Sequence, residues 1–224
     1  EHFLRIEFPS AGDPQPYSIL AESSVMDVNR QAWAASTSLL VHPADLYVGL
    51  RSERYFVERG IPLEIEFIVT DLDGVPVPER TIDVQAARLE WKFTEGSWGL
   101  NEVDVQECAL KSAEEALSCT FETPIGGRYQ ITASITDEQG RRNQSRLTRW
   151  VSGGELAPSR EVEQEEAVLI PDRDAYQPGD VAEILVQSPF SPAEGLLTVN
   201  RSGLLYTESF TIEAGESTIT LQVP

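Results

Sequence analysis

Two cysteines and two histidines are the side chains in this sequence that could most directly carry out covalent or metal chemistry. Cys108 and Cys119 lie eleven positions apart, whereas His2 and His42 are distant from both. A zinc site uses about four ligands, so two thiols with no neighbouring histidine disfavour such a site. The spacing of the cysteines also excludes a redox Cys-x-x-Cys pair.

We therefore expect Cys108 and Cys119 to form a disulfide. The polar residues 111–115 predict a turn between two strands, so that the two sulfurs face each other across a hairpin. Closing this loop would stabilise the fold by about 2–3 kcal/mol. Such a bond persists in an oxidising compartment, which predicts a periplasmic, cell-surface or secreted location. The alternative is a pair of buried free thiols, which a mass measurement without reductant would reveal.

Other residue patterns give no catalytic centre. Nucleophilic hydrolysis needs a base beside its nucleophile, but His42 precedes Pro43 in an expected connection between domains. The segment Gly96-Ser97-Trp98-Gly99 is not a Gly-x-Ser-x-Gly elbow. Asp71-Leu72-Asp73-Gly74 lacks the further oxygen ligands of a calcium loop and predicts a hairpin turn. We therefore expect no enzyme activity, no metal and no cofactor.

Four tryptophans could form a platform for sugar if they were exposed together, namely Trp33, Trp91, Trp98 and Trp150. Trp91 follows an alternating apolar pattern and is expected in the core, whereas Trp98 is expected at the surface of a hairpin tip. Carbohydrate binding would then perturb Trp98 fluorescence. The triplets that begin at Asn143 and Asn200 fit the glycosylation sequon, which often arises by chance.

The charge and composition exclude two classes of partner. The 224 residues include 37 acidic and 17 basic side chains, which leaves a formal net charge of −20. This charge repels nucleic acid and anionic lipid headgroups. Apolar residues make up 41% of the chain but form no run of about 18 that could span a bilayer. The chain starts with neither Met nor a signal segment, so we expect either a mature product or a portion of a longer protein, and the repeat described below favours the second.

Hydrophobic residues recur with a period of two, which is typical of strands with one buried face. One such run holds Leu63, Ile65, Phe67 and Val69, and another extends from Tyr129 to Ile135. The run from Thr81 to Thr94 changes parity, which predicts a bulge or a bend near Ala87 and Arg88 that brings both halves to the same face. Seven strands can be placed between Leu46 and Val151, about the number in one β-sandwich.

The sequence also repeats itself. A Tyr-x-Ile-x-Ala strand with a polar turn after it begins at Tyr17 and recurs 112 positions later at Tyr129. A second pattern, a Tyr-containing turn that leads into a strand, begins at Tyr55 and recurs 121 positions later at Tyr176. Both offsets match the length of one sandwich domain, which predicts a tandem array.

Two segments resemble the alpha-2-macroglobulin family, and most closely its long bacterial members. The first is the turn Tyr176-Gln177-Pro178-Gly179-Asp180 together with residues 196–206 (LLTVNRSGLLY). The second is residues 44–74 and their continuation to Trp91, which look like the macroglobulin-like domains upstream of the bait region in that family. The resemblance covers almost the whole chain and implies an all-β fold of tandem antiparallel sandwiches.

The resemblance and the repeat together predict four segments. Residues 1–42 would be the C-terminal strands of one macroglobulin-like domain, and residues 43–152 a complete second domain. Residues 153–161 would form a linker, and residues 162–224 a third domain that is truncated at its C-terminus.

The same resemblance implies a part in an exported protease trap, in which cleavage of a bait segment is followed by covalent capture through a thioester. The family's thioester lies in a Cys-Gly-Glu-Gln motif, which neither Cys108 nor Cys119 matches, and no bait-like segment is found. This portion would therefore be scaffold, with the other domains of the parent chain and, through the parent, target proteases as partners. The alternative is a cell-surface adhesion or ligand-binding array of immunoglobulin-like domains, because a sandwich fold alone does not specify function.

Overall fold

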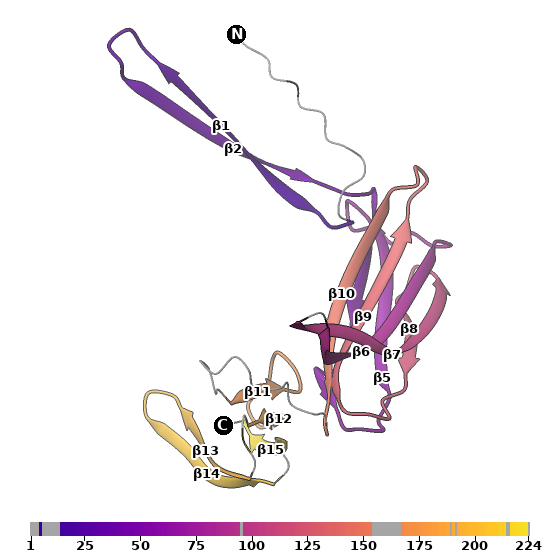
Figure 1. The fold of residues 1–224 in the computed structure, drawn as a ribbon, viewed down its shortest axis with the longest axis vertical. Helices are drawn as coiled ribbons and strands as arrows, with labels where there is room; N and C mark the ends of the chain where they lie inside the picture. The colour runs from indigo at the N-terminus through magenta and orange to yellow at the C-terminus, as the bar shows by residue number, and fades with distance from the viewer. Residues whose placement is uncertain are drawn as a thin grey trace.

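A computed structural model describes residues 5, 14–94, 96–153, 167–188, 190, 192–213 and 216–223. Every regular element in these ranges is a β-strand (Figure 1). The all-β class expected from the sequence is therefore confirmed. Residues 154–161 of the expected linker and the side chain of Trp98 lie outside the described part.

A two-sheet sandwich forms the centre of the chain. One sheet has the order β3-β5-β8, and the other has the order β4-β10-β9-β6-β7. The first sheet consists of β3 (Leu46–Arg51), β5 (Leu63–Asp71) and β8 (Leu117–Phe121). The second consists of β4 (Phe56–Val57), β10 (Arg142–Val151), β9 (Gly127–Thr136), β6 (Thr81–Thr94) and β7 (Ser97–Lys111).

The sandwich has eight strands where seven were expected, because its first strand is split between the sheets. β3 pairs antiparallel with β5, whereas β4, only five residues further along, pairs parallel with the end of β10. The chain thus crosses from one sheet to the other between Arg51 and Phe56.

The core lies between the two sheets and follows the alternation in the sequence. On β5 the side chains of Leu63, Ile65, Phe67 and Val69 are fully buried, and on β9 Tyr129 begins a similar row. Each such apolar side chain contributes about 1.5–3 kcal/mol when it leaves water. The hydroxyl of Tyr129 donates a hydrogen bond of 2.7 Å to the carbonyl oxygen of Ile125, so this polar group is satisfied inside the core.

The predicted bulge is confirmed, but its consequence differs from the expectation. The register between β6 and β7 shifts between Ala86 and Arg88, and the extra residue lies on β7, where Asp104 has a φ of 51°. β6 keeps an unbroken register with β9 from Asp83 to Leu89. The alternation along β6 is therefore preserved, and the apolar residues of its second half lie on the face opposite to the core.

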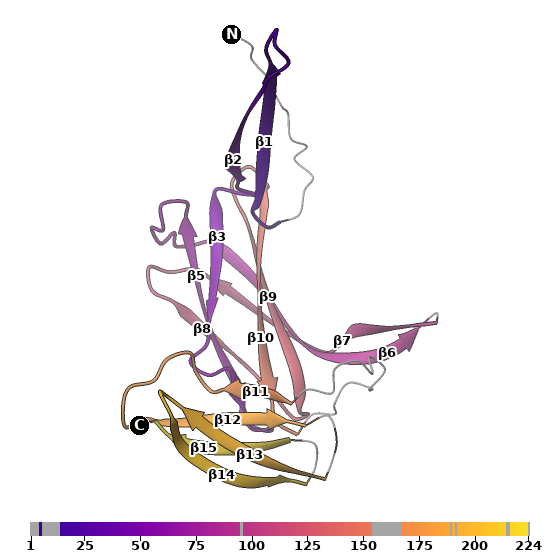
Figure 2. The same cartoon turned by 90° about the vertical axis from the view of Figure 1, so that its left-hand side faces the viewer.

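The expectation that Trp91 fills the core is consequently wrong, because this residue is 43% exposed. Beyond Leu89 the β6–β7 hairpin continues as a two-stranded ribbon that projects from the sandwich (Figure 2). No strand of the sandwich covers this end, so Phe93 and Leu100 are also exposed.

A separate hairpin precedes the sandwich and extends away from it (Figure 1). Its strands, β1 (Tyr17–Met26) and β2 (Ala32–Val41), pair with each other over ten residues and with no other strand in the described part. The carbonyl oxygen of Pro14, just before β1, accepts a hydrogen bond of 3.0 Å from the backbone N–H of Gln144 on β10.

The turns of β1–β2 and β9–β10 are built alike, as the sequence repeat suggests. In the first, the Asp27 carboxylate accepts hydrogen bonds from the amides of residues 29 and 31. In the second, the Asp137 carboxylate accepts them from residues 139 and 141. The fourth residue of each turn is left-handed, with a φ of 64° at Arg30 and 76° at Gly140.

The C-terminal part forms two small sheets. One has the order β11-β12-β15, with β11 (Val168–Pro171), β12 (Val181–Gln187) and β15 (Glu216–Gln222). The other is the hairpin of β13 (Ala193–Asn200) and β14 (Leu204–Ile212). Val186, Ile212 and Ile219 form the small core between these sheets.

Candidate functional site

The disulfide joins the two sheets of the sandwich. Cys108 lies on β7 and Cys119 on β8, and their Cα atoms are 6.5 Å apart. The expectation of a bond across a hairpin is wrong, because β7 pairs with β6 and β8 pairs with β5. Nearby, the side chain of Gln106 exchanges two hydrogen bonds of 2.8 Å with the backbone of Glu122. These links close the side of the sandwich where the edge strands β7 and β8 meet.

The other residues singled out for chemistry are not brought together. The ring of His42 lies 2.8 Å from the hydroxyl of Tyr47, and His2 lies outside the described residues. The Asp71 carboxylate accepts hydrogen bonds from the amides of Asp73 and Val75, as expected of a turn. In the described part of the chain, no cluster of His, Cys, Asp or Glu could hold a metal ion.

Asn143, the first residue of one of the two sequons, has a structural role. Asn143 is buried, and its side-chain oxygen accepts a hydrogen bond of 3.0 Å from the amide of Val48 on β3. The folded protein therefore does not offer this side chain for glycosylation.

The arrangement that could serve a function is the joint between the sandwich and the C-terminal sheets. Tyr55, between β3 and β4, donates a backbone hydrogen bond of 2.8 Å to the carbonyl oxygen of Asp172. Its own carbonyl oxygen accepts one of 3.0 Å from Trp150 on β10. Tyr55 thus connects the last strand of the sandwich to the segment after β11.

An apolar cluster crosses the same joint. Phe56 is only 1% exposed and packs with Ile170 of β11 and Leu185 of β12, while Tyr55 and Trp150 cover the cluster from the side. Successive side chains of a strand point to opposite faces, so Ile184 and Val186 of β12 face its own core while Leu185 faces the sandwich.

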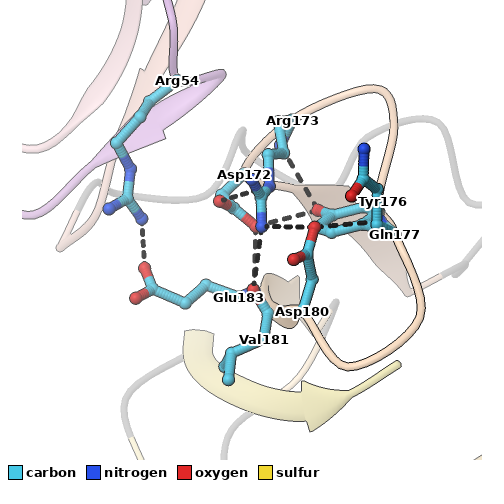
Figure 3. A network of polar contacts seen from close by, with 8 residues as sticks. All are labelled: Arg54, Asp172, Arg173, Tyr176, Gln177, Asp180, Val181 and Glu183. Atoms are coloured by element: carbon cyan, nitrogen blue, oxygen red, sulfur yellow. Dashed lines mark hydrogen bonds and ion pairs between the residues drawn. The ribbon is translucent and has the colours of Figure 1, made fainter. Parts of the chain in front are cut away.

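A network of polar contacts lies at the same joint (Figure 3). Arg54 forms an ion pair with Glu183 of β12, and its guanidinium lies 5.6 Å from the centre of the Phe56 ring. One oxygen of the Asp172 carboxylate accepts hydrogen bonds of 2.8 Å from both the hydroxyl of Tyr176 and the amide of Glu183. Burial and this hydrogen bond from Tyr176 raise the pKa of the tyrosine, so it remains a donor at neutral pH.

Arg149 completes the joint on the side of the sandwich. Its guanidinium lies 4.6 Å from the centre of the Tyr55 ring and donates hydrogen bonds to the hydroxyl of Ser52 and the carbonyl oxygen of Thr148. Burial lowers the pKa of Arg149, yet an arginine stays charged at neutral pH. The residue therefore orients Tyr55 by cation–π contact, an interaction that is stronger when desolvated.

The opposite end of the sandwich has a matching polar anchor. Burial raises the pKa of Asp137, but hydrogen bonds from the amides of Arg141 and Asp45 and from the guanidinium of Arg141 outweigh it and hold this pKa below its usual value. Arg141 also pairs with Asp45, which directly precedes β3. The turn between β9 and β10 is thereby tied to the point where the chain enters the sandwich.

Replacing Asp137 with Asn should make the sandwich less stable and less sensitive to acid. One amide oxygen can still accept two backbone hydrogen bonds, but the new NH₂ group faces the donors of Asp45 and Arg141, at a cost of about 1–3 kcal/mol. Because the folded pKa is lowered, the wild-type carboxylate stabilises above the unfolded pKa, and this contribution disappears as the pH falls through the folded pKa. Urea unfolding between neutral pH and pH 3 would measure the free energy of unfolding of both proteins. The difference between the wild type and the variant should shrink below about pH 4. An equal difference in free energy of unfolding at neutral pH and at pH 3 would contradict a stabilising role of the Asp137 carboxylate.

The sequence indicates the joint only indirectly. Tyr55 and Tyr176 were recognised as repeat markers, but their separate parts in the joint, with Tyr55 binding Asp172 through its backbone and Tyr176 through its hydroxyl, were not foreseen. The available signal is the consecutive apolar run Ile184-Leu185-Val186, because an apolar Leu185 on the face away from the core of its own sheets indicates a second packing partner.

Comparisons with known proteins agree with the expected resemblance. No family model matches the chain. An alpha-2-macroglobulin homolog from Nostoc is 24% identical over 220 residues, which cover 94% of this chain and 11% of that protein. The resemblance to the alpha-2-macroglobulin family is therefore confirmed. The chain spans about a tenth of the length of this relative.

The solved structures that are similar to most of the chain include alpha-2-macroglobulins and an adhesion protein. A Salmonella alpha-2-macroglobulin mutant has a TM-score of 0.38 at 16% identity, covering 94% of this chain and 14% of that chain. The Escherichia coli alpha-2-macroglobulin activated by porcine elastase has a TM-score of 0.36 at 14% identity, with coverages of 94% and 24%. A tetra-tandem repeat of a large adhesion protein has a TM-score of 0.32 at 15% identity, with coverages of 93% and 48%.

The described residues contain no helix long and apolar enough to cross a membrane.

Proposed function

We propose that this chain is a scaffold segment of an exported, alpha-2-macroglobulin-like protease inhibitor. The support comes from the similarity to the Nostoc homolog along nearly the whole chain. Bait cleavage and thioester capture would belong to other parts of the parent. This segment would hold those parts at a fixed separation.

The joint around Phe56 is the observation that carries this proposal. A spacer must keep successive modules from rotating freely, and a default interdomain contact permits motion unless it is large and apolar. Here a buried aromatic ring, a backbone hydrogen bond at Tyr55 and the Arg54–Glu183 ion pair act at the same place. Together these contacts support a fixed distance and a fixed rotation between the sandwich and the C-terminal sheets.

The proposed module boundaries are residues 1–42, 43–152, 153–161 and 162–224. The likeness of the β1–β2 and β9–β10 turns supports the first boundary, because it makes β1–β2 the closing hairpin of a preceding module. In the same way β11 to β15 would be the opening strands of a following module. An extracytoplasmic location is supported by the disulfide between Cys108 and Cys119.

Protease assays test the scaffold role directly. The isolated chain should leave the hydrolysis of a protein substrate by elastase or trypsin unchanged and should not be cut at a preferred internal site at low protease ratios, because it carries neither bait nor thioester. Digestion would be followed by gel and mass spectrometry, with heat-unfolded chain as the control that is cut readily. Strong inhibition by the isolated chain would contradict the proposal.

The adhesion alternative makes a different prediction about the parent. A scaffold of a protease trap should be followed in the longer reading frame by a bait segment and a Cys-Gly-Glu-Gln motif. An adhesion array should continue as further sandwiches that end in a surface anchor. Sequencing the transcript on both sides of the segment distinguishes the two.

A further inference from the structure

The β6–β7 ribbon carries a row of apolar side chains on its face opposite to the core. Trp91, Phe93 and Leu100 are exposed in this row, and the half-buried Leu89 lies at its root. Trp91 and Leu100 are direct neighbours across the two strands. The ribbon bends towards the side of the sandwich away from β3 and β5, so this face lies on the inner side of the bend (Figure 2).

Two residues of opposite charge flank the root of the apolar row. Leu89 is paired in register with Arg128 of β9 on one side and with Glu102 of β7 on the other. Residues that are paired in register lie on the same face of a sheet. Neighbouring strands are about 4.8 Å apart, so the backbones of the two charged residues are about 10 Å apart.

Glu102 is oriented by two side-chain amides. One oxygen of its carboxylate accepts a hydrogen bond of 3.3 Å from Gln85, and the other accepts one of 3.2 Å from Gln130. Glu102 forms no ion pair with the described residues. Each carboxylate oxygen can accept a second hydrogen bond, so this group still has lone pairs for hydroxyl donors.

Arg128 has a guanidinium group without an acceptor. Its Nε is shielded from solvent and makes no hydrogen bond to the described residues, whereas its two terminal nitrogens are open to solvent. Arg128 forms no ion pair in the described part of the chain either. Buried polar groups almost always have a partner. An unpartnered guanidinium beside an exposed aromatic row therefore points to a ligand that supplies oxygen acceptors.

We propose that this face of the ribbon binds a neutral oligosaccharide. A pyranose ring has an apolar C–H face and hydroxyl groups around its rim. The C–H face lies on the ring of Trp91, while the hydroxyls accept hydrogen bonds from Arg128 and donate them to Glu102. A binding site of this kind combines apolar contact with a few polar groups that fix the orientation of the ligand. The site does not depend on the scaffold role proposed above.

The charge and the size of the face favour this class of ligand over others. The charges of Arg128 and Glu102 cancel, and the net charge of −20 on the chain repels anionic polysaccharides. A stable protein partner uses about 20–30 residues on each side. The apolar row offers only four, Leu89, Trp91, Phe93 and Leu100, which suits a ligand a few rings long.

Calorimetric titration of the 224-residue chain tests the site, with cellohexaose, chitohexaose, maltohexaose and mannohexaose as probes. At least one of these neutral hexasaccharides should bind, with the same affinity at low and high salt because the ligand carries no charge. Trp91→Ala should weaken this binding at least about tenfold, because the ring contact is lost. Trp91→Tyr keeps an aromatic ring and should retain most of the affinity. Arg128→Met and Glu102→Ala should each weaken binding as well.

Matched controls remove similar groups elsewhere in the chain. Trp33 is exposed on β2 and Glu64 on β5, so Trp33→Ala and Glu64→Ala should bind the hexasaccharide like the wild type. Urea unfolding of each variant checks that the sandwich remains folded.

Four results would overturn the inference. They are binding of none of the four probes, an equal loss in the Trp33→Ala control, tighter binding of hexagalacturonate than of any neutral sugar, and dimers of the wild type that Trp91→Ala abolishes. The last result would show that a second copy covers the face. None of these results bears on the protease assay or the joint, so the scaffold proposal would stand or fall separately.

Discussion

Replacing Phe56 with Ala should separate the unfolding of the C-terminal sheets from that of the sandwich. The ring is 1% exposed and touches Ile170 and Leu185 across the joint, so its removal leaves a cavity between the two parts. Truncating a buried Phe costs about 3–5 kcal/mol. The loss should appear as a second, earlier transition in calorimetry and as faster amide exchange in β11 and β12, while β5 and β9 remain protected.

Phe190→Ala is the matched control, since this ring is 59% exposed in the C-terminal part. Surface substitutions usually change stability by less than about 0.5 kcal/mol. A single unshifted transition in the Phe56 variant would mean that the joint is not the element that couples the two parts, and the scaffold proposal would lose its main support.

Removing the disulfide should have the second large effect. Replacing Cys108 and Cys119 together with Ala should lower the free energy of unfolding of the sandwich by about 3 kcal/mol, because a loop of this size is no longer closed in the unfolded chain. The bond joins edge strands of opposite sheets, so its loss also removes a direct link between them. Denaturant titrations of the sandwich transition would measure the shift.

Reductant provides the control for this variant. Treating the wild type with reductant should move its midpoint towards that of the double variant, while the double variant should not respond. A wild type and a variant with the same midpoint under oxidising conditions would show that the bond does not contribute to stability.

The sandwich itself was readable from the sequence because its core depends on local alternation. Leu63 to Val69 and Tyr129 to Ile135 keep a period of two, and that pattern alone assigns one face to the core. The bulge was readable for the same reason, since a change of parity within one strand requires an irregularity in its ladder.

The location of the extra residue could not be read in this way. The parity change on β6 was compatible with a bulge on β6 or with an outward-facing apolar row, and only the pairing with β9 decides between them. Trp91 is exposed because it lies on the face of β6 opposite to the core and because β9 begins opposite Leu89, so that β6 loses this neighbour before it reaches Trp91. The alternation of apolar residues describes each strand by itself. It holds no information on where the neighbouring strand in the sheet begins or ends.

The disulfide and the joint show the same limit at longer range. A spacing of eleven residues with a polar turn suits a hairpin as well as a crossing between two sheets, and the choice depends on β5 and β6 as competing partners. The joint unites residues near position 55 with residues near positions 170 and 185, which no local periodicity connects. Only the tandem repeat gave a hint, by marking Tyr55 and Tyr176 as equivalent points.

The split first strand has a mechanical consequence. Tyr55 lies between β3, which belongs to one sheet, and β4, which belongs to the other, and it is also the residue that holds Asp172. A force that pulls on the C-terminal sheets therefore acts on the sandwich at the segment between β3 and β4. Because these strands belong to different sheets, the hydrogen bonds of both sheets share the force. We expect such a unit to resist extension until both sheets yield together, as a strut does rather than a hinge.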